Sequence, residues 1–239
     1  MSEPIQYPIP WDQVMSLFPH LKNGTRRNVD DFSAKIVAKM QPGPHLEGLE
    51  NLPEDPRFIL VANHYQRKGL WIIHVASALT QAVAVRYGRQ QDPPVHWMVT
   101  ANWPPLRLGP WSMPSPGDWL LPKVAHALSC FPVSFAGNNP AYTASTLKRI
   151  LKSSEHLRRP IGLFPEGVAG TAGNLTDPLP GLERFLPLLA KRGWPAVPAG
   201  VSENGRFVIR FGSLVTAEEL LASSNSARLL MSRVAEMIQ

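Results

Sequence analysis

Two residues capable of proton transfer and ligand binding, a histidine and a glutamate, each follow a short hydrophobic run in this sequence. The run FILVA (58–62) leads through Asn63 to His64, and the run IGLF (161–164) leads to Glu166. Both runs are typical of buried strands, and open α/β sheets bind ligands at the carboxyl ends of such strands. An imidazole and a carboxylate at neighbouring strand ends would form a site with a general base and a binding carboxylate.

Three short motifs follow one another in a fixed order along the chain. They are Asn63-His64, the segment FPEG (164–167) and the apolar segment AVPAGV (196–201). In these motifs and their spacing the sequence, from roughly residue 55 to the C-terminus, resembles the glycerolipid acyltransferase superfamily, the family of the lysophosphatidic acid acyltransferases. The resemblance implies transfer of a fatty acyl group from coenzyme A or acyl carrier protein to a hydroxyl or amine of a lipid-like acceptor. It also implies direct attack, without a covalent enzyme intermediate.

The resemblance implies that His64 is the general base. A hydroxyl is a poor nucleophile, and a neutral imidazole that takes its proton during the attack contributes on the order of 10²–10⁴ in rate. Gly69 occupies the position of the aspartate that orients this histidine in the family. The sequence leaves three replacements open, namely Glu166, Asp118 and a backbone carbonyl. Position 69 has then either simply lost the carboxylate of the family, or it belongs to a fixed turn that requires glycine. Such a turn would need close backbone approach or a positive φ.

The arginines with which the family holds an acceptor phosphate are absent. Val168-Ala169 stands where the family usually has Thr-Arg, and strand 130–135 runs into Ala136-Gly137 without an arginine. We therefore expect an acceptor that is not a simple glycerol phosphate. The polar, uncharged residues of this rim suit a hydroxylated acceptor such as a sugar or polyol lipid; they are Asn138, Asn139, Thr171 and Asn174.

The segments that follow the two motifs predict the substrate contacts. Arg67 and Lys68 enter a helix N-terminus, which attracts anions, and could hold a phosphate or the nucleotide part of coenzyme A, although solvated charge is the plainer interpretation. The glycine-rich run 164–174 lets backbone amides face a ligand, the plainer alternative being a mobile loop. We predict His64 and Glu166 as the catalytic residues. The predicted substrate-binding residues are Asn63, Arg67, Lys68, Gly69, Asn138, Pro165, Gly167 and Thr171.

Alternating strand and helix patterns predict an α/β fold with a mostly parallel central sheet flanked by helices. The predicted strands are 57–62, 95–101, 130–135, 160–164, 195–201 and 206–211, the last two paired as a hairpin. The predicted helices are 69–86, 118–129, 140–154, 180–191, 216–222 and 225–238. Residues 1–45 are expected to form an N-terminal helical appendage, with one helix capped by Asp30-Asp31, ahead of an acyltransferase-like domain at 46–239.

Composition and missing motifs argue against several classes of protein. A single cysteine, Cys130, rules out an internal disulfide framework and fits a reducing cytosol. The sequence contains no G-x-S-x-G elbow, no Walker loop, no G-x-G-x-x-G after the first strand and no clustered Cys/His set. Hydrolase, NTPase, dehydrogenase and zinc functions are therefore weakly supported, and we expect no cofactor beyond the acyl thioester donor. Scattered basic residues without a binding motif argue against nucleic acid.

Charge and tryptophan placement favour a membrane surface. The net charge of +6 suits an anionic membrane or an anionic acyl thioester. Four of the seven tryptophans fall within 96–120, an arrangement that suits a membrane interface, an acyl-chain tunnel, or packing on the core. No apolar run approaches the ~18–20 residues of a membrane span, and the acidic, proline-bearing N-terminus is not typical of a secretory signal. We expect a cytoplasmic protein that associates peripherally with the membrane.

Two other functions fit the same features. The first is a catalytically inactive lipid-binding relative of the acyltransferases, which the departures at Gly69, Val168 and Ala169 favour. The second, weaker alternative is a basic adaptor that docks on anionic membranes through the tryptophan-rich loop. Thioester turnover would separate the enzyme from both, and saturable lipid binding would separate the two.

Overall fold

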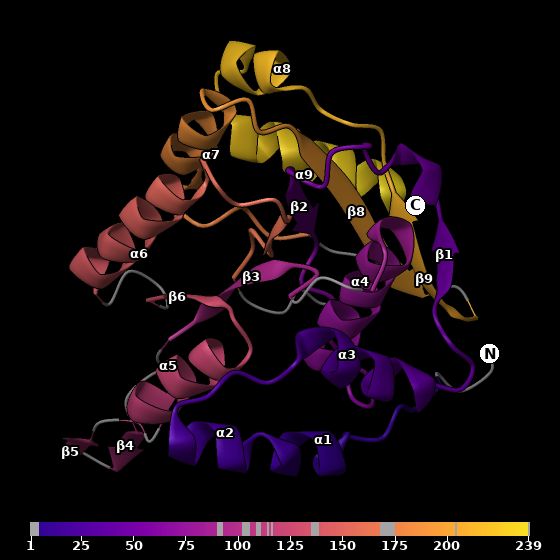
Figure 1. Ribbon diagram of the computed structural model, residues 1–239. Helices are drawn as coiled ribbons and strands as arrows, with labels where there is room; N and C mark the ends of the chain where they lie inside the picture. The colour runs from indigo at the N-terminus through magenta and orange to yellow at the C-terminus, as the bar shows by residue number, and fades with distance from the viewer. Residues whose placement is uncertain are drawn as a thin grey trace.

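A computed structural model of the chain describes residues 5–89, 93–101, 106–108, 111–113, 115, 117–134, 139–167, 175–203 and 205–238. Within these residues a seven-stranded sheet has the order β1-β9-β8-β2-β7-β3-β6, and a separate two-stranded hairpin pairs β4 with β5. Every neighbouring pair in the large sheet is parallel except β8 and β9, which form the expected antiparallel hairpin. The predicted α/β class with a mostly parallel sheet is confirmed (Figure 1).

The elements follow the predicted order closely. The strands are β1 (His45–Glu47), β2 (Ile59–Ala62), β3 (His96–Thr100), β4 (Leu106–Leu108), β5 (Trp111–Met113), β6 (Phe131–Val133), β7 (Ile161–Leu163), β8 (Ala196–Glu203) and β9 (Phe207–Phe211). The helices are α1 (Trp11–Ser16), α2 (Phe18–Asn23), α3 (Val29–Ala38), α4 (Ile72–Tyr87), α5 (Gly117–Ala127), α6 (Pro140–Ser153), α7 (Leu182–Ala190), α8 (Ala217–Ala222) and α9 (Ser226–Met237), with a short 3-10 turn at Leu49–Asn51.

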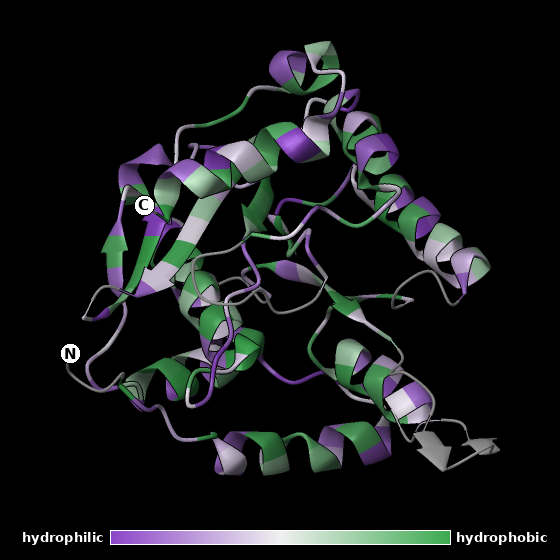
Figure 2. Ribbon diagram, turned by 180° about the vertical axis from the view of Figure 1, so that it is seen from behind, coloured by the Kyte–Doolittle hydropathy of each residue, from purple (hydrophilic) through white to green (hydrophobic). Residues whose placement is uncertain are grey.

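The central strand β2 separates two hydrophobic cores. Its alternate side chains face opposite ways, as the period of two in a strand requires. Leu60 and Ala62 join the core that contains Val75 and Leu79 of α4. Ile59 and Val61 join the core on the other face, which is built with α6, α7, α8 and α9. All four residues of β2 are fully buried, so the end of this strand is held rigidly. In Figure 2, which shows the molecule from behind, β2 is green, whereas the edge strand β1 mixes purple and green.

Close packing between β3 and β7 depends on a glycine. An added Cβ on Gly162 would lie 2.5 Å from Cε3 of Trp97, a distance that real Cβ atoms do not tolerate. The missing side chain therefore makes room for the indole of Trp97, which is 5% exposed. This contact decides where an aromatic wall of the functional site stands.

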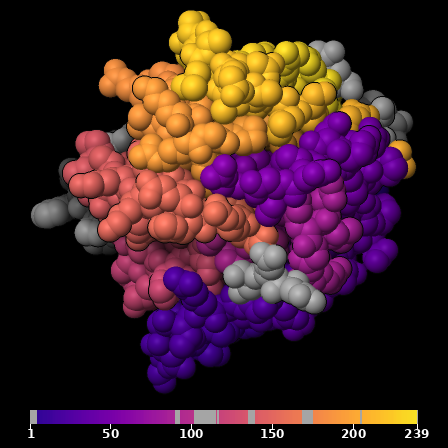
Figure 3. Space-filling view, turned by 45° about the horizontal axis from the view of Figure 1, so that its top comes forward, coloured from indigo at the N-terminus to yellow at the C-terminus, as the bar shows by residue number. Residues whose placement is uncertain are grey.

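The N-terminal helices pack on the side of the sheet domain that carries α4 and α5. Leu17, Phe32 and Ile36 form a small core with Ile73 of α4 and Val124 of α5. In Figure 3 the indigo N-terminal helices form a ridge along the lower side of the molecule. The domain boundary after residue 45 stays a prediction. Across the described ranges, no helix is both long and apolar enough to cross a membrane.

Three features of the fold differ from the sequence-based predictions. The cap of α3 is Asn28, whose side chain accepts a hydrogen bond from the backbone N–H of Asp31 at 2.6 Å; Asp30-Asp31 lie in the first turn, where carboxylates also favour a helix. Strand β1, too short to show a period, pairs with β9 at the sheet edge. The tryptophan-rich loop contains the β4–β5 hairpin.

Candidate active site

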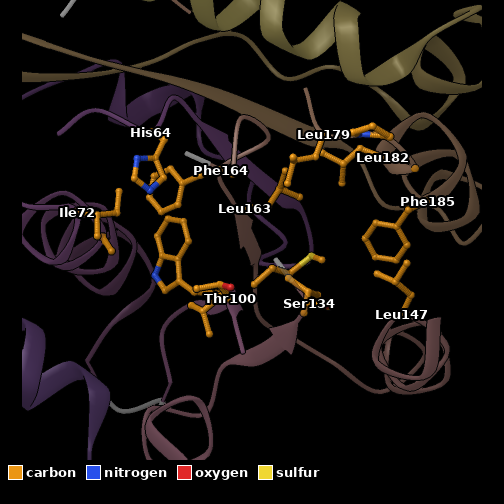
Figure 4. A pocket seen from close by; sticks show the side chains of 18 of the residues that line it. His64, Ile72, Thr100, Ser134, Leu147, Leu163, Phe164, Leu179, Leu182 and Phe185 are labelled. Atoms are coloured by element: carbon orange, nitrogen blue, oxygen red, sulfur yellow. The ribbon is translucent and has the colours of Figure 1, made fainter. Parts of the chain in front are cut away.

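An apolar cavity of about 380 Å³ lies at the carboxyl ends of the central strands. It extends from His64, past Phe164 and Leu163, to Phe185 and Leu147 on the far side (Figure 4). Its volume falls within the range usual for small-molecule sites, roughly 300–1,000 Å³. The lining residues are His64, Ile72, Ile73, Ala76, Trp97, Met98, Val99, Thr100, Val133, Ser134, Leu147, Leu163, Phe164, Gly167, Leu179, Pro180, Gly181, Leu182 and Phe185.

His64 stands two residues beyond the end of β2, beside a row of aromatic rings. Its ring meets the edge of Phe164 at a centroid distance of 5.5 Å. Phe164 in turn stacks face to face on Trp97, with centroids 4.8 Å apart and planes 5° from parallel. Trp97 is fixed by the hydrogen bond that its Nε1 donates to Oγ1 of Thr80 at 2.9 Å. The row fixes one wall of the cavity against which the imidazole rests.

Burial of the His64 ring favours its neutral form. Burial lowers its pKa below the ordinary value of 6.5, and the nearby carboxylate of Glu166 opposes this shift only in part. Nδ1 is buried and has no hydrogen-bond partner among the described residues. Nε2 is then the ring nitrogen available for proton transfer to or from a bound molecule. A neutral imidazole at neutral pH is the form that general-base catalysis needs.

Glu166 binds the backbone around His64. The residue is 2% exposed, and its carboxylate accepts hydrogen bonds from the backbone N–H of His64 at 2.6 Å and of Thr176 at 2.8 Å. Bonds from N–H groups to a buried carboxylate are charge-assisted and strong. Glu166 thus ties the end of β2 to the segment before α7. Glu166 and Asp118 are two of the groups considered as replacements for the family's aspartate, and Asp118 lies in the first turn of α5. Among the described residues, neither forms a hydrogen bond with the His64 ring.

Asn63 also has a backbone partner. Its Nδ2 donates to the carbonyl of Val201 at 2.9 Å, and its Oδ1 accepts from the N–H of the same residue at 2.7 Å. This two-way pairing continues the contact between β2 and β8 beyond the last residue of β2. The pairing fixes the chain just before His64, which lines the cavity.

Gly69 lies in a tight turn that the N-terminal segment covers. Arg67 and Leu70 exchange both backbone hydrogen bonds at 3.0 Å, and Gly69 between them has a φ of +77°, which glycine adopts without strain. An added Cβ would lie 1.7 Å from Oε1 of Gln6, while the backbone N–H of Tyr7 donates to the carbonyl of Gly69 at 2.6 Å. Of the two interpretations of Gly69, the fixed turn is the one with direct structural support.

Arg67 is bound by protein groups. Its guanidinium forms an ion pair with Glu203 and also donates to the carbonyl of Ile5 at 2.6 Å. Tyr65 adds a hydroxyl bond to Glu203 at 2.8 Å, and burial together with this carboxylate raises the pKa of Tyr65 to about 12. Lys68 is exposed. Neither Arg67 nor Lys68 lines the cavity, whose described lining contains no lysine or arginine.

The remaining predicted site residues fall into two groups. Gly167 lines the cavity, and the carbonyl of Pro165 accepts a hydrogen bond from the N–H of Leu179 at 2.8 Å. Asn138 and Thr171 lie outside the described residues, as do Asn174 and the departures at 136–137 and 168–169. Asn139 caps α6 by accepting a bond from the N–H of Tyr142 at 3.0 Å.

Sequence reasoning missed several residues of the site. Thr100 and Ser134 provide polar groups on the lining, each at the end of a strand that carried no recognised motif. Glu203 and Gln6 were missed because their partners lie far along the chain. The signal that could have found Thr100 and Ser134 is their place at the carboxyl ends of hydrophobic strands, the same signal that pointed to His64.

Comparison with protein-family models finds no match, and neither does comparison with curated proteins. Among solved structures, the chain is similar to the crystal structure of the 1-acyl-sn-glycerophosphate (LPA) acyltransferase PlsC from Thermotoga maritima. The TM-score is 0.55 and the sequence identity 16%, over 90% of this chain and 77% of that chain. At this identity the likeness establishes an acyltransferase-like fold, in agreement with the predicted architecture.

Proposed function

We propose that this protein is an acyltransferase that moves a fatty acyl group from an acyl thioester to a hydroxyl or amine of a lipid-like acceptor. The donor would be acyl coenzyme A or acyl-acyl carrier protein. The observation that carries the proposal is the imidazole of His64. Burial favours its neutral form, and it lines an apolar cavity on the edge of the sheet where α/β folds bind ligands. The acyltransferase-like fold supports the same reaction class.

In the proposed reaction, Nε2 of His64 takes the proton of the acceptor hydroxyl as the oxygen attacks the thioester carbonyl carbon. The tetrahedral intermediate collapses, the carbon–sulfur bond breaks, and the leaving thiolate takes the proton back from the imidazolium. The acceptor becomes an ester and the donor a free thiol, so the histidine returns to its neutral form. Glu166 and Asn63 contribute by holding the backbone that carries the ring.

The apolar cavity suits the acyl chain of the donor or acceptor. Its far wall is built from side chains of α6 and α7, including Leu147, Leu182 and Phe185. Each methylene group buried there would contribute about 0.8 kcal/mol. The stacked rings of Phe164 and Trp97 would flank the chain near the reacting carbonyl.

The charges around the cavity favour an uncharged acceptor. A partly buried phosphate is usually held by bidentate arginine contacts. The described lining offers none, and Arg67 is paired with Glu203. Thr100 and Ser134 instead offer groups suited to hydroxyls. We therefore propose a hydroxylated acceptor, such as a sugar or polyol lipid, in place of a simple glycerol phosphate.

Exposed apolar residues on the N-terminal helices and on α5 support peripheral attachment to a membrane. Trp11 and Met15 of α1 are 63% and 57% exposed, Phe18 of α2 is 57% exposed, and Trp119 of α5 is 60% exposed. Such side chains favour the membrane–water interface, and the net charge of +6 favours an anionic surface. An acceptor lipid could then reach the cavity from the bilayer.

One observation favours the second candidate, an inactive lipid-binding protein. The buried Nδ1 of His64 lacks an acceptor among the described residues, so the tautomer that a base requires has no orienting partner there. A thiol-release assay separates the two. An active enzyme releases thiol when given a panel of acyl thioesters and lipid acceptors, and His64→Ala abolishes this release. Saturable lipid binding without thiol release would identify the inactive relative.

A further inference from the structure

A second cavity, of about 450 Å³, lies between α5 and α6 beside the edge strand β6. It shares no lining residue with the cavity at His64. Its lining is Arg26, His96, Pro122, His126, Ser129, Cys130, Phe131, Pro132, Tyr142, Arg149, Ser153 and Leu157. Polar and basic side chains thus replace the aliphatic lining of the first cavity.

Acidic side chains are missing from the described lining of this cavity, whose charged residues are basic. Two arginines and two histidines line it, and none of the lining residues is an aspartate or glutamate. Arg26 and Arg149 are exposed, and neither forms an ion pair with any residue that the structure describes. With no carboxylate in the described lining or in an ion pair with either arginine, the attraction of the two guanidinium groups for an anion is not cancelled by a direct partner.

Two of the basic groups, Arg149 and His126, have contacts on the cavity wall. The guanidinium of Arg149 lies over the ring of Phe131, 5.9 Å from its centroid. A ring nitrogen of His126, Nε2, is 3.2 Å from the carbonyl of Gly24, which ties α5 to the loop that carries Arg26. Placement by such contacts reduces the ordering cost of binding a ligand.

Hydroxyl groups continue the lining along α6. Tyr142, Arg149 and Ser153 are spaced seven and four residues apart and therefore share one face of the helix. Across the cavity, Ser129 has a φ of +54°, which is uncommon for a residue other than glycine. Guanidinium groups and hydroxyls can both donate hydrogen bonds to phosphate oxygens.

Helix α5 joins this cavity to the exposed apolar surface. Trp119, Pro122 and His126 lie three and four residues apart, so the exposed indole and the cavity-lining residues share a face of the helix. The ammonium of Lys123 lies 5.0 Å from the ring of Trp119. A tryptophan beside cationic groups is typical of a surface that meets lipid head groups.

We propose that the cavity between α5 and α6 binds a phosphate group, at a site separate from His64. Arg26 and Arg149 supply the main attraction, and the phosphate is carried by a lipid head group or by a soluble phosphorylated molecule. The site would hold a ligand other than the acyl acceptor, because it has no lining residue in common with the proposed acyl cavity.

The test compares binding in two charge-matched double variants. Arg26→Gln/Arg149→Gln removes the two guanidinium groups, and the control Lys191→Gln/Arg228→Gln removes the same charge from exposed residues that line neither cavity. The soluble probe is inorganic phosphate, titrated calorimetrically against chloride at matched ionic strength. The membrane probe is flotation with phosphatidylcholine vesicles made anionic by phosphatidic acid or, to the same charge, by oleic acid.

We expect the wild type and the control to bind at least one phosphate probe, and the Arg26/Arg149 variant to bind it about 10-fold more weakly or worse. Preference for phosphatidic acid over oleic acid identifies a lipid phosphate, and binding of inorganic phosphate alone identifies a soluble one. Equal affinity in the two double variants, or no phosphate binding by the wild type, overturns the proposal. If the double variant melts early, Arg149→Gln alone gives the same comparison. No readout depends on turnover, so failure here leaves the proposed acyl transfer untouched.

Discussion

The carboxylate of Glu166 accepts a hydrogen bond from the backbone N–H of His64 at 2.6 Å, so one predicted catalytic residue holds the other by its main chain. The same carboxylate binds the N–H of Thr176 at 2.8 Å, on the segment that leads to the cavity wall at Leu179 and Leu182. Glu166 therefore couples the position of His64 to the shape of the cavity. Its contribution to catalysis is expected to be one of positioning.

Removing the imidazole should abolish turnover without unfolding the protein. We expect His64→Ala to lower kcat by on the order of 10²-fold or more, because the acceptor loses its base. His20 is partly exposed and does not line the cavity, so His20→Ala serves as the control. Thiol release and thermal melting are measured on both. Wild-type turnover by a folded His64→Ala protein would exclude His64 from the mechanism.

The pH dependence should report a base with a lowered pKa. Burial favours the neutral imidazole of His64, so its pKa lies below 6.5. Because only the neutral form accepts a proton, kcat/KM should rise with pH through this pKa and be level at neutral pH. The measurement is the kcat/KM profile of thiol release between about pH 5 and pH 8. An ascending limb centred above 6.5 would contradict the assignment.

Replacing the carboxylate of Glu166 should cost stability as well as rate. An amide can accept from one backbone N–H but presents its own N–H₂ to the other, so Glu166→Gln leaves one buried donor unsatisfied. We expect a loss of about 1–3 kcal/mol in the free energy of unfolding, with lower kcat. Urea denaturation measures the first and thiol release the second. Glu218→Gln, on the exposed side of α8, should change neither.

Restoring an aspartate at position 69 should damage the turn. Any Cβ there meets Gln6, and φ is +77°, so Gly69→Asp should lose on the order of 1 kcal/mol or more of stability. Gly69→Asp/Gln6→Ala removes the steric overlap and should regain part of that loss without exceeding wild-type kcat. Chemical denaturation and thiol release are compared across the two variants. A large rate gain in the double variant would show that Gly69 is merely a lost carboxylate.

Filling the far end of the apolar cavity should shorten the accepted acyl chain. Leu147 lines that end, and Leu147→Trp would displace the last methylene groups, each worth about 0.8 kcal/mol. We expect kcat/KM to shift toward shorter acyl thioesters. Leu188 of α7 is 39% exposed, and Leu188→Trp should leave the chain-length profile unchanged. An unchanged profile in Leu147→Trp would place the acyl chain elsewhere.

The sequence predicted the sheet well because its strands are buried runs bounded by polar residues, and a buried run such as 59–62 has few other structures available. It predicted where His64 would stand because parallel strands end at one edge. It could not predict the partners of Arg67 and Asn63, which lie in β8 more than a hundred residues away. The three-residue strand β1 was also missed, since so short a segment has no readable period. Nor could it show that Gln6 fills the space beside Gly69, because that contact depends on tertiary packing.

Strand β2, which leads to His64, pairs only with strands far along the chain among the described residues, and this bears on how the protein acquires its site. The bond from His64 to Glu166 spans 102 residues, and the pairing of Asn63 with Val201 spans 138. Forming a contact of this span closes a long loop, and the entropy that this costs is lost before the contact stabilises the chain, which slows folding. During synthesis, β2 must wait for β7 and β8 to emerge, with both edges unpaired and open to aggregation until then. The order in which the chain is made therefore delays assembly of the site until β8 has been synthesised.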